Sequence, residues 1–227
     1  MVTHVALIGA SGHASDVLSL IEHLNEGGAR FEVAGLFHSN PETVDRARFF
    51  GRDVDIRNTA ELARVAAEHE SLRFISCVGY PDARRDAVEM VANEMAPAYA
   101  LVHGSAAIGT RVELGSGAVV LAQVSISPCV VVGEHAYVSH GALVGHDTIV
   151  GAYSSLMPGC SVSGDCVLGT GVMVGSNATV LEKISVGDGA VIGAGAVVTS
   201  DVEAGATVLG APARPIEPKS LVMDLDS

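Results

Sequence analysis

The 227-residue sequence has no tryptophan, few other aromatic residues and few basic ones. Phe, Trp and Tyr make up 4% of the residues, which leaves little material for the aromatic platforms on which proteins stack nucleobases. Lys and Arg number 13 against 26 Asp and Glu, so the formal net charge is −13. We therefore expect neither a nucleic-acid partner nor a membrane partner, since both need a basic face.

Long apolar runs and paired cysteines are also missing. Gly, Ser, His or Asp interrupts every hydrophobic stretch before the roughly 18–20 residues that a spanning helix needs. The first residues, MVTHVALIGASGH, contain no basic segment and too short an apolar run for a signal peptide. The four cysteines form no CxxC pair, which argues against a cysteine zinc site and a disulfide scaffold. These absences favour a cytoplasmic protein that holds no metal.

The first half of the chain alternates short apolar runs with helical periodicities. Apolar runs predict strands over residues 5–8, 31–37 and 74–78. Helices are predicted over residues 15–24 and 82–95, and a third after a capping box of Asn58 and Glu61. Such alternation implies a small parallel sheet with helices packed on it.

The second half carries the strongest pattern in the sequence. An aliphatic residue stands at every sixth position from Ile108 to Val198, and the next residue is often Gly. A period of six fits neither an α-helix nor a hairpin array and indicates a parallel β-helix of hexapeptide repeats. Three hexapeptides make one triangular coil, so we expect about five coils with the aliphatic side chains inside. Cys160 and Cys166 fall on inward positions and are expected to fill the core.

The segment Gly-Ala-Ser-Gly-His-Ala at residues 9–14 lies between a predicted strand and a predicted helix. Backbone N–H groups and the helix dipole favour an anion such as a phosphate there, although a tight turn alone is the alternative. The segment is not GxGxxG, and His38 and Ser39 stand where a dinucleotide site needs an acidic residue. Arg84 and Arg85 would either add positive charge near this edge or form a solvated helix face.

His146 and Asp147 follow an aliphatic-Gly pair and are expected on a corner of a coil, where side chains point outward. A neutral imidazole is a competent general base near neutral pH, and an adjacent carboxylate raises its basicity. The alternative is a zinc site of His135, His140 and His146, as in γ-class carbonic anhydrases. The third histidine of that family would fall near Tyr99, which argues against a metal.

Four segments together are similar to one known family: VALIGASGHASDV, LVHGSAAIG, SHGALVGHDTIVG and LGAPARPI. They resemble bacterial sugar acyltransferases of the NeuD/PglD type, which use acetyl-CoA to acetylate nucleotide-linked amino sugars or sialic acids. The resemblance extends over nearly the whole chain. It implies a Rossmann-like, nucleotide-sugar-binding α/β domain over residues 1–102, a left-handed parallel β-helix over 103–216 and a tail over 217–227. It also implies a homotrimer with active sites between subunits.

The resemblance implies roles for individual residues. His146 would take a proton from the acceptor amine or hydroxyl, Asp147 would raise its basicity, and the Gly164 N–H would stabilise the oxyanion. The acetyl-CoA contacts it implies are Ser155, Ser176, Lys183, Ala194, Ala211, Pro212 and Arg214. The substrate contacts it implies are Ser11, Gly12, His13, His38, Ser39, Gly79 and His140.

This sequence departs from the family pattern at two places. Ser155 stands where relatives have a coenzyme-contacting His, and His38 and Ser39 replace an acidic pair that reads a UDP-sugar in some relatives. The carrier nucleotide therefore stays open. The sequence predicts an acetyl-CoA-dependent N- or O-acetyltransferase of an amino sugar. The alternatives are a γ-carbonic-anhydrase-like metal-dependent hydratase and a non-catalytic trimeric binding module.

Overall fold

The computed structural model describes residues 2–45, 49, 54–69 and 71–216. The predicted tail at 217–227 lies outside the described residues. None of the helices in these ranges has the length and apolar character needed to span a bilayer.

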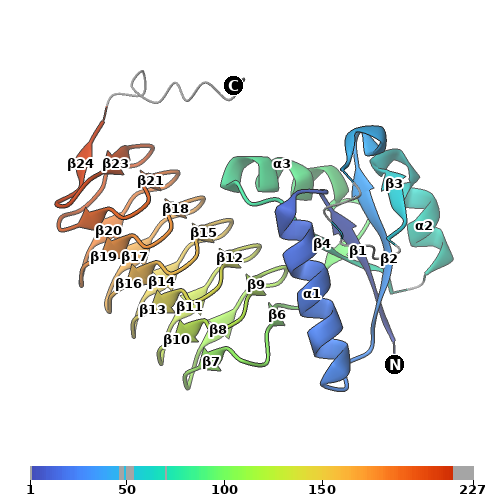
Figure 1. Ribbon diagram of the computed structural model, residues 1–227, viewed down its shortest axis with the longest axis horizontal. Helices are drawn as coiled ribbons and strands as arrows, with labels where there is room; N and C mark the ends of the chain where they lie inside the picture. The colour runs from blue at the N-terminus through green and yellow to red at the C-terminus, as the bar shows by residue number, and fades with distance from the viewer. Residues whose placement is uncertain (1, 46–48, 50–53, 70, 217–227) are drawn as a thin grey trace.

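The N-terminal unit is a five-stranded parallel sheet with helices packed on it, as predicted (Figure 1). Its strands are β1 Thr3–Ile8, β2 Phe31–His38, β3 Ile56–Asn58, β4 Arg73–Ser76 and β5 Ala96–Pro97, in the order β3-β2-β1-β4-β5. Its helices are α1 Gly12–Glu26, α2 Leu62–Glu68 and α3 Pro81–Val91, with single 3₁₀ turns at η1 Pro41–Thr43 and η3 Thr59–Glu61. The short edge strands β3 and β5 were not predicted.

The predicted capping box is present. The Asn58 side chain accepts a hydrogen bond from the Ala60 N–H at 2.9 Å, and the Glu61 side chain accepts one from the Asn58 N–H at 3.2 Å. The turn η3 begins there and runs directly into α2. Leu62 and Val65 form the buried face of α2, which explains why the chain turns into a helix at this point.

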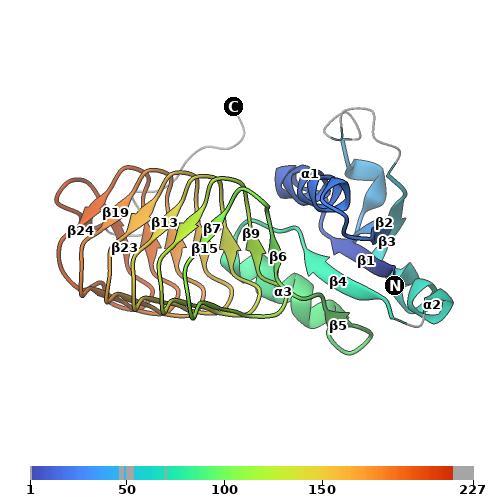
Figure 2. The same ribbon diagram turned by 90° about the horizontal axis from the view of Figure 1, so that it is seen from below.

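The C-terminal unit is a stack of coils built from two- and three-residue strands (Figure 2). These are β6 Leu101–Val102, β7 Ala107–Ile108, β8 Glu113–Leu114, β9 Val119–Val120, β10 Ser125–Ile126, β11 Val131–Val132, β12 Tyr137–Val138, β13 Leu143–Val144, β14 Ile149–Val150, β15 Ser155–Leu156, β16 Ser161–Val162, β17 Val167–Leu168, β18 Met173–Val174, β19 Thr179–Val180, β20 Ser185–Val186, β21 Val191–Ile192, β22 Val197–Val198, β23 Thr207–Leu209 and β24 Arg214–Pro215.

Each strand pairs in parallel with the strand one coil later, 18 residues on, as in the register of Tyr137 with Ser155. Three sheets result, which we call face 1 (β24-β23-β21-β18-β15-β12-β9-β6), face 2 (β22-β19-β16-β13-β10-β7) and face 3 (β20-β17-β14-β11-β8). The turns between them form three edges of the prism: corner 1–2, corner 2–3 and corner 3–1. The predicted parallel β-helix is therefore confirmed.

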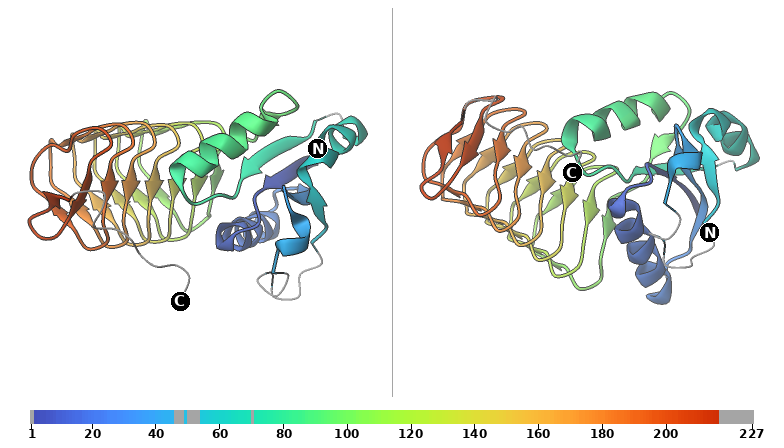
Figure 3. Two further views of the ribbon diagram at one scale, coloured as in Figure 1. Left: turned by 90° about the horizontal axis from the view of Figure 1, so that it is seen from above. Right: turned by 45° about the horizontal axis from the view of Figure 1, so that its top comes forward.

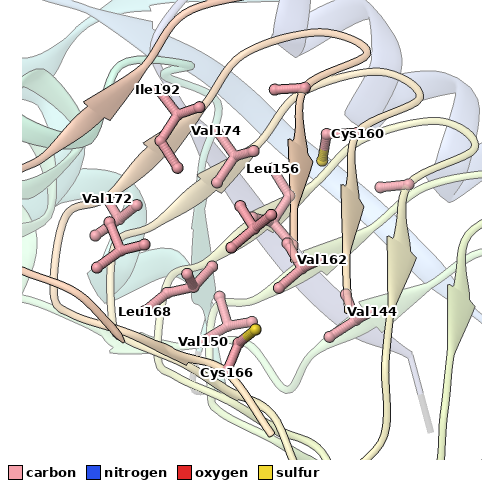
Figure 4. Packing of buried hydrophobic residues seen from close by; sticks show 14 of the residues in the cluster. Val144, Val150, Leu156, Cys160, Val162, Cys166, Leu168, Val172, Val174 and Ile192 are labelled. Atoms are coloured by element: carbon pink, nitrogen blue, oxygen red, sulfur yellow. The ribbon is translucent and has the colours of Figure 1, made fainter. Parts of the chain in front are cut away.

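The core of the prism consists of the predicted aliphatic residues (Figure 4). All of them are buried except Ile108 and Leu114, which belong to the first coil and have no coil below them. Cys160 and Cys166 are fully buried, as predicted. Burial raises the pKa of the Cys160 thiol to about 12, so this group stays neutral and behaves as an apolar filler.

The N-terminal unit stands at the β6 end of the prism (Figure 3). Val119, Leu121 and Tyr137 from face 1 pack in one hydrophobic cluster with α1 and β1. The chain enters the prism at Leu101, just before the predicted boundary. Because this contact is apolar and continuous, the sheet is held against the first coils of face 1.

Candidate functional site

His146 and Asp147 lie on corner 2–3, between β13 and β14, and both side chains are exposed. Asp147 Oδ2 lies 2.9 Å from His146 Nδ1, so the carboxylate can accept the Nδ1 proton and orient the ring. The backbone of Asp147 has a φ of +57°, a left-handed conformation that Asp tolerates better than most residues. When Nδ1 carries the proton, Nε2 is the nitrogen that is free to accept one.

Gly164 lies next to this imidazole, one coil further along the chain. A Cβ at Gly164 would lie 2.8 Å from both Cε1 and Nε2 of His146. A Cβ at Gly145 would lie 2.4 Å from the Gly164 nitrogen. Within the described part of the chain, the Gly164 N–H has no backbone acceptor. Corner 2–3 therefore combines a base with a free N–H donor, and acyl transfer needs both.

Asp165, which follows Gly164, is a neighbour of this pair that was not predicted. A nitrogen of His146 and carboxylate oxygens of Asp147 and Asp165 all lie within 4.8 Å of one another. The signal that could have found Asp165 is the length of a coil, because it lies 18 residues after Asp147. Corner 2–3 therefore carries two carboxylates beside one imidazole.

The histidine set of the metal alternative does not converge within the chain. His135 is buried, and its ring stacks between Phe74 and Tyr153 with centroid distances of 5.7 and 5.3 Å. His140 is exposed on corner 1–2, whereas His146 lies on corner 2–3. Among the described residues, His146, Asp147 and Asp165 are the only group of three that could share an ion.

A second candidate region lies at the carboxyl end of the parallel sheet. A pocket of about 440 Å³ there is lined by the predicted Ser11, His38 and Ser39, together with Gly9 and Thr59. The pocket lies where helix α1 begins, and α1 has no acidic residue in its first turn. Ser11 Oγ donates to the Cys77 carbonyl at 2.8 Å and does not cap the helix, so the first-turn N–H groups receive no side-chain cap.

His13 lies half-buried beside this pocket, in contact with the predicted Gly79. A Cβ on Gly79 would come within 2.2–2.7 Å of the His13 ring, so only glycine allows the ring to lie there. The ring also meets Tyr137 of the prism edge-on, with 4.8 Å between centroids. Burial, and to a lesser extent Arg84, lower the pKa of His13, while Asp16 opposes the shift.

The predicted coenzyme residues are spread over the prism. Ser176 and Ala194 lie on corner 1–2, and Lys183 lies exposed on corner 2–3, one coil beyond Asp165. Arg214, with Ala211 and Pro212, lies exposed at the far end of the prism. A single chain therefore does not bring these residues together, nor does it bring His13 to His146.

The predicted coenzyme contact of Ser155 is wrong. Ser155 is fully buried on face 1, and its hydroxyl donates to the Gly79 carbonyl at 2.7 Å and accepts from Arg84 Nη2 at 2.7 Å. No surface of this side chain is left for a coenzyme. Arg84 is likewise not part of a solvated helix face, because it is 1% exposed. Neither position was recognisable from the sequence, since both depend on how the two units dock.

The comparisons with known proteins agree with this geometry. The model of the bacterial transferase hexapeptide (six repeats) matches residues 147–182 and 165–200. No curated protein sequence matches the chain. PerB from Caulobacter crescentus, solved in complex with CoA and GDP-perosamine, has a TM-score of 0.82 and 27% sequence identity, over 96% of this chain and 99% of that chain.

The acetyltransferase domain of PglB from Neisseria gonorrhoeae FA1090 has a TM-score of 0.81 and 28% identity, over 94% of this chain and 99% of that chain. The same domain has also been solved in complex with acetyl coenzyme A. WeeI from Acinetobacter baumannii AYE, at 22% identity and a TM-score of 0.81, shares the fold over 94% of this chain and 100% of that chain. These similarities confirm the predicted resemblance to NeuD/PglD-type sugar acyltransferases.

Proposed function

We propose that this chain is an acetyl-CoA-dependent N-acetyltransferase that acts on a nucleotide-linked amino sugar. The structurally similar PerB was solved with CoA and GDP-perosamine, and the similar PglB domain with acetyl coenzyme A. The observation that carries the proposal is the arrangement on corner 2–3. There the imidazole of His146 is held by Asp147 and lies against the free N–H of Gly164.

The reaction on this corner is a direct transfer. The acceptor nitrogen attacks the thioester carbonyl carbon, and His146 Nε2 takes the proton that the nitrogen loses. The Gly164 N–H donates to the oxyanion of the tetrahedral intermediate. When the intermediate collapses, the carbon–sulfur bond breaks, and the proton held by His146 passes to the departing thiolate. The products are an N-acetylated sugar and free coenzyme A.

The complete site is shared between copies of the chain in a homotrimer. His146 lies on corner 2–3, between face 2 and face 3, whereas the sheet pocket lies against face 1. Exposed apolar side chains flank corner 2–3, with Leu143 on one side and Ile149 on the other, and Val131 and Val167 continue the stripe on face 3; all four are 37–48% exposed. Packing this stripe against a second prism would bury it and place His146 at the seam.

The binding regions follow from the same arrangement. The N-terminal unit is a Rossmann-like domain over residues 1–102, which holds the nucleotide at the pocket lined by Ser11, His38 and Ser39. The prism over residues 103–216 is a left-handed β-helix. Coenzyme A lies in the groove between neighbouring prisms, where Ser176 and Ala194 of one copy face Lys183 and Arg214. These two cations offset part of the coenzyme's negative charge on a chain of net charge −13.

The test is an assay of the purified chain with acetyl-CoA and a panel of nucleotide-linked amino sugars that includes GDP-perosamine. We expect release of free thiol and a mass gain of one acetyl group on the sugar. His146→Ala should lower the rate by at least about a hundredfold. His69→Ala, which removes a histidine far from corner 2–3, serves as the control. A silent wild type across the panel, or unchanged activity in His146→Ala, would overturn the proposal.

A further inference from the structure

Arg84 is a buried cation at the junction of the two units. It lies on α3, is 1% exposed, and donates hydrogen bonds into both units. Nη1 donates to the carbonyls of Val78 at 2.7 Å and Gly79 at 3.3 Å. Nη2 donates to the Tyr153 carbonyl at 2.6 Å, the Ser154 carbonyl at 3.1 Å and Ser155 Oγ at 2.7 Å. One side chain therefore ties the loop after β4 to the coil that carries β15.

The surroundings of Arg84 are unusual for a buried charge. Among the described residues, no carboxylate forms an ion pair with it, and Nε has no hydrogen-bond partner. Burial lowers the pKa of Arg84 to about 10, so the guanidinium remains charged at neutral pH. A buried cation held only by carbonyl and hydroxyl dipoles is costly for stability, and an apolar side chain would satisfy the fold better. The geometry therefore points to a role in positioning rather than in folding.

The loop that Arg84 holds is the wall against which His13 rests. The Gly79 carbonyl accepts from both Arg84 and Ser155, and the His13 ring packs directly on Gly79. The prism thus sets the position of Ser155, Ser155 and Arg84 set the position of Gly79, and Gly79 sets the position of His13. Under the proposed function, His13 contacts the acceptor sugar nucleotide.

We propose that Arg84 is a positioning residue for the acceptor: it fixes the Val78–Gly79 loop to the prism so that the nucleotide sugar is presented at a constant distance from the catalytic corner of the neighbouring copy. This inference rests on the proposed function. Its consequence is specific, because loosening the loop disturbs the acceptor but leaves the groove for coenzyme A intact. The effect should therefore divide between the two substrates.

The experiment is steady-state kinetics of Arg84→Met with each substrate varied in turn, alongside thermal unfolding. Methionine keeps the length and apolar stem of the side chain but removes all five hydrogen bonds. We expect the KM of the sugar nucleotide to rise at least tenfold while the KM of acetyl-CoA stays within twofold. Arg85→Met is the matched control: Arg85 lies on the same helix and packs over the Tyr153 ring at 5.4 Å, but no bond of the described chain joins it to the loop.

Ser155→Ala provides a second measurement in case Arg84→Met folds poorly. It removes one of the two donors to the Gly79 carbonyl, so it should raise the KM of the sugar nucleotide in the same direction and by a smaller factor. Equal changes in the KM of both substrates, or a lowered unfolding temperature with an unchanged KM for the sugar nucleotide, would overturn the inference. A wild type without activity would refute the proposed function instead, so the two failures are distinguishable.

Discussion

Gly164→Ala is the sharpest test of the corner on which His146 lies. The added methyl carbon would sit 2.8 Å from Cε1 and Nε2 of the imidazole, which is closer than unbonded atoms approach. The ring is 62% exposed and can swing into solvent, so the fold loses little. Gly164 does not have a positive φ, so alanine adopts its backbone conformation without strain. We therefore expect the unfolding free energy to change by less than about 1 kcal/mol.

The catalytic consequence of the same change is large. Displacing a general base typically lowers a rate by about 10²–10⁴, which corresponds to about 3–5 kcal/mol of transition-state stabilisation. The assay is kcat from thiol release at saturating substrates, paired with thermal unfolding. Gly145→Ala is the comparison, because its methyl would meet the backbone nitrogen of Gly164 at 2.4 Å and should lower both stability and activity. A Gly164→Ala enzyme with kcat within threefold of wild type would refute the assignment of His146 as the base.

Four further predictions follow from the structure. Asp147→Asn should lower kcat about tenfold to a hundredfold, because a charge-assisted bond to Nδ1 becomes a neutral one, with little change in either KM; equal kcat in the two enzymes would contradict this role. Lys183→Ala and Arg214→Ala should raise the KM of acetyl-CoA more than they lower kcat, and an unchanged KM in both would remove them from the coenzyme groove. Ile149→Asp should convert trimers to monomers in analytical ultracentrifugation, since it places a charge in the exposed apolar stripe; a trimer that survives would show that face 3 is not the interface. Burial lowers the pKa of His13, His103 and His135, so the unfolded state binds protons more readily than the folded state as pH falls through about 6.5. Stability to urea should therefore drop between pH 7.5 and 5.5, and His135→Phe, which keeps an aromatic ring between Phe74 and Tyr153, should weaken that drop.

Local patterns in the sequence were enough to predict the prism. Each coil repeats the same short-range rule, and its aliphatic residues meet only their own neighbours 18 residues away, so periodicity alone places Val144 and Val162 inside. The capping box at Asn58 is likewise local. The edge strands β3 and β5 carry no such pattern, because strands this short owe their pairing to the sheet beside them.

The candidate site was predictable only where the residues lie within one corner. His146 and Asp147 are adjacent in sequence, and Gly164 lies one coil away, so the repeat itself locates them. Ser155 and Arg84 were placed wrongly or left undecided because their environment is made by docking two units whose contact leaves no periodic trace. A hydroxyl on an exposed-looking position of a repeat is indistinguishable from one covered by another part of the chain.

The 18-residue register between stacked coils restricts how this protein can change in length. Insertion of a whole coil adds one storey to the tower and returns every later side chain to its former edge. Loss of a single hexapeptide turns everything beyond it through a third of a revolution, and would carry Lys183 away from the edge that bears His146. Natural length variation should therefore come in complete storeys or in loops that leave an edge and return to it.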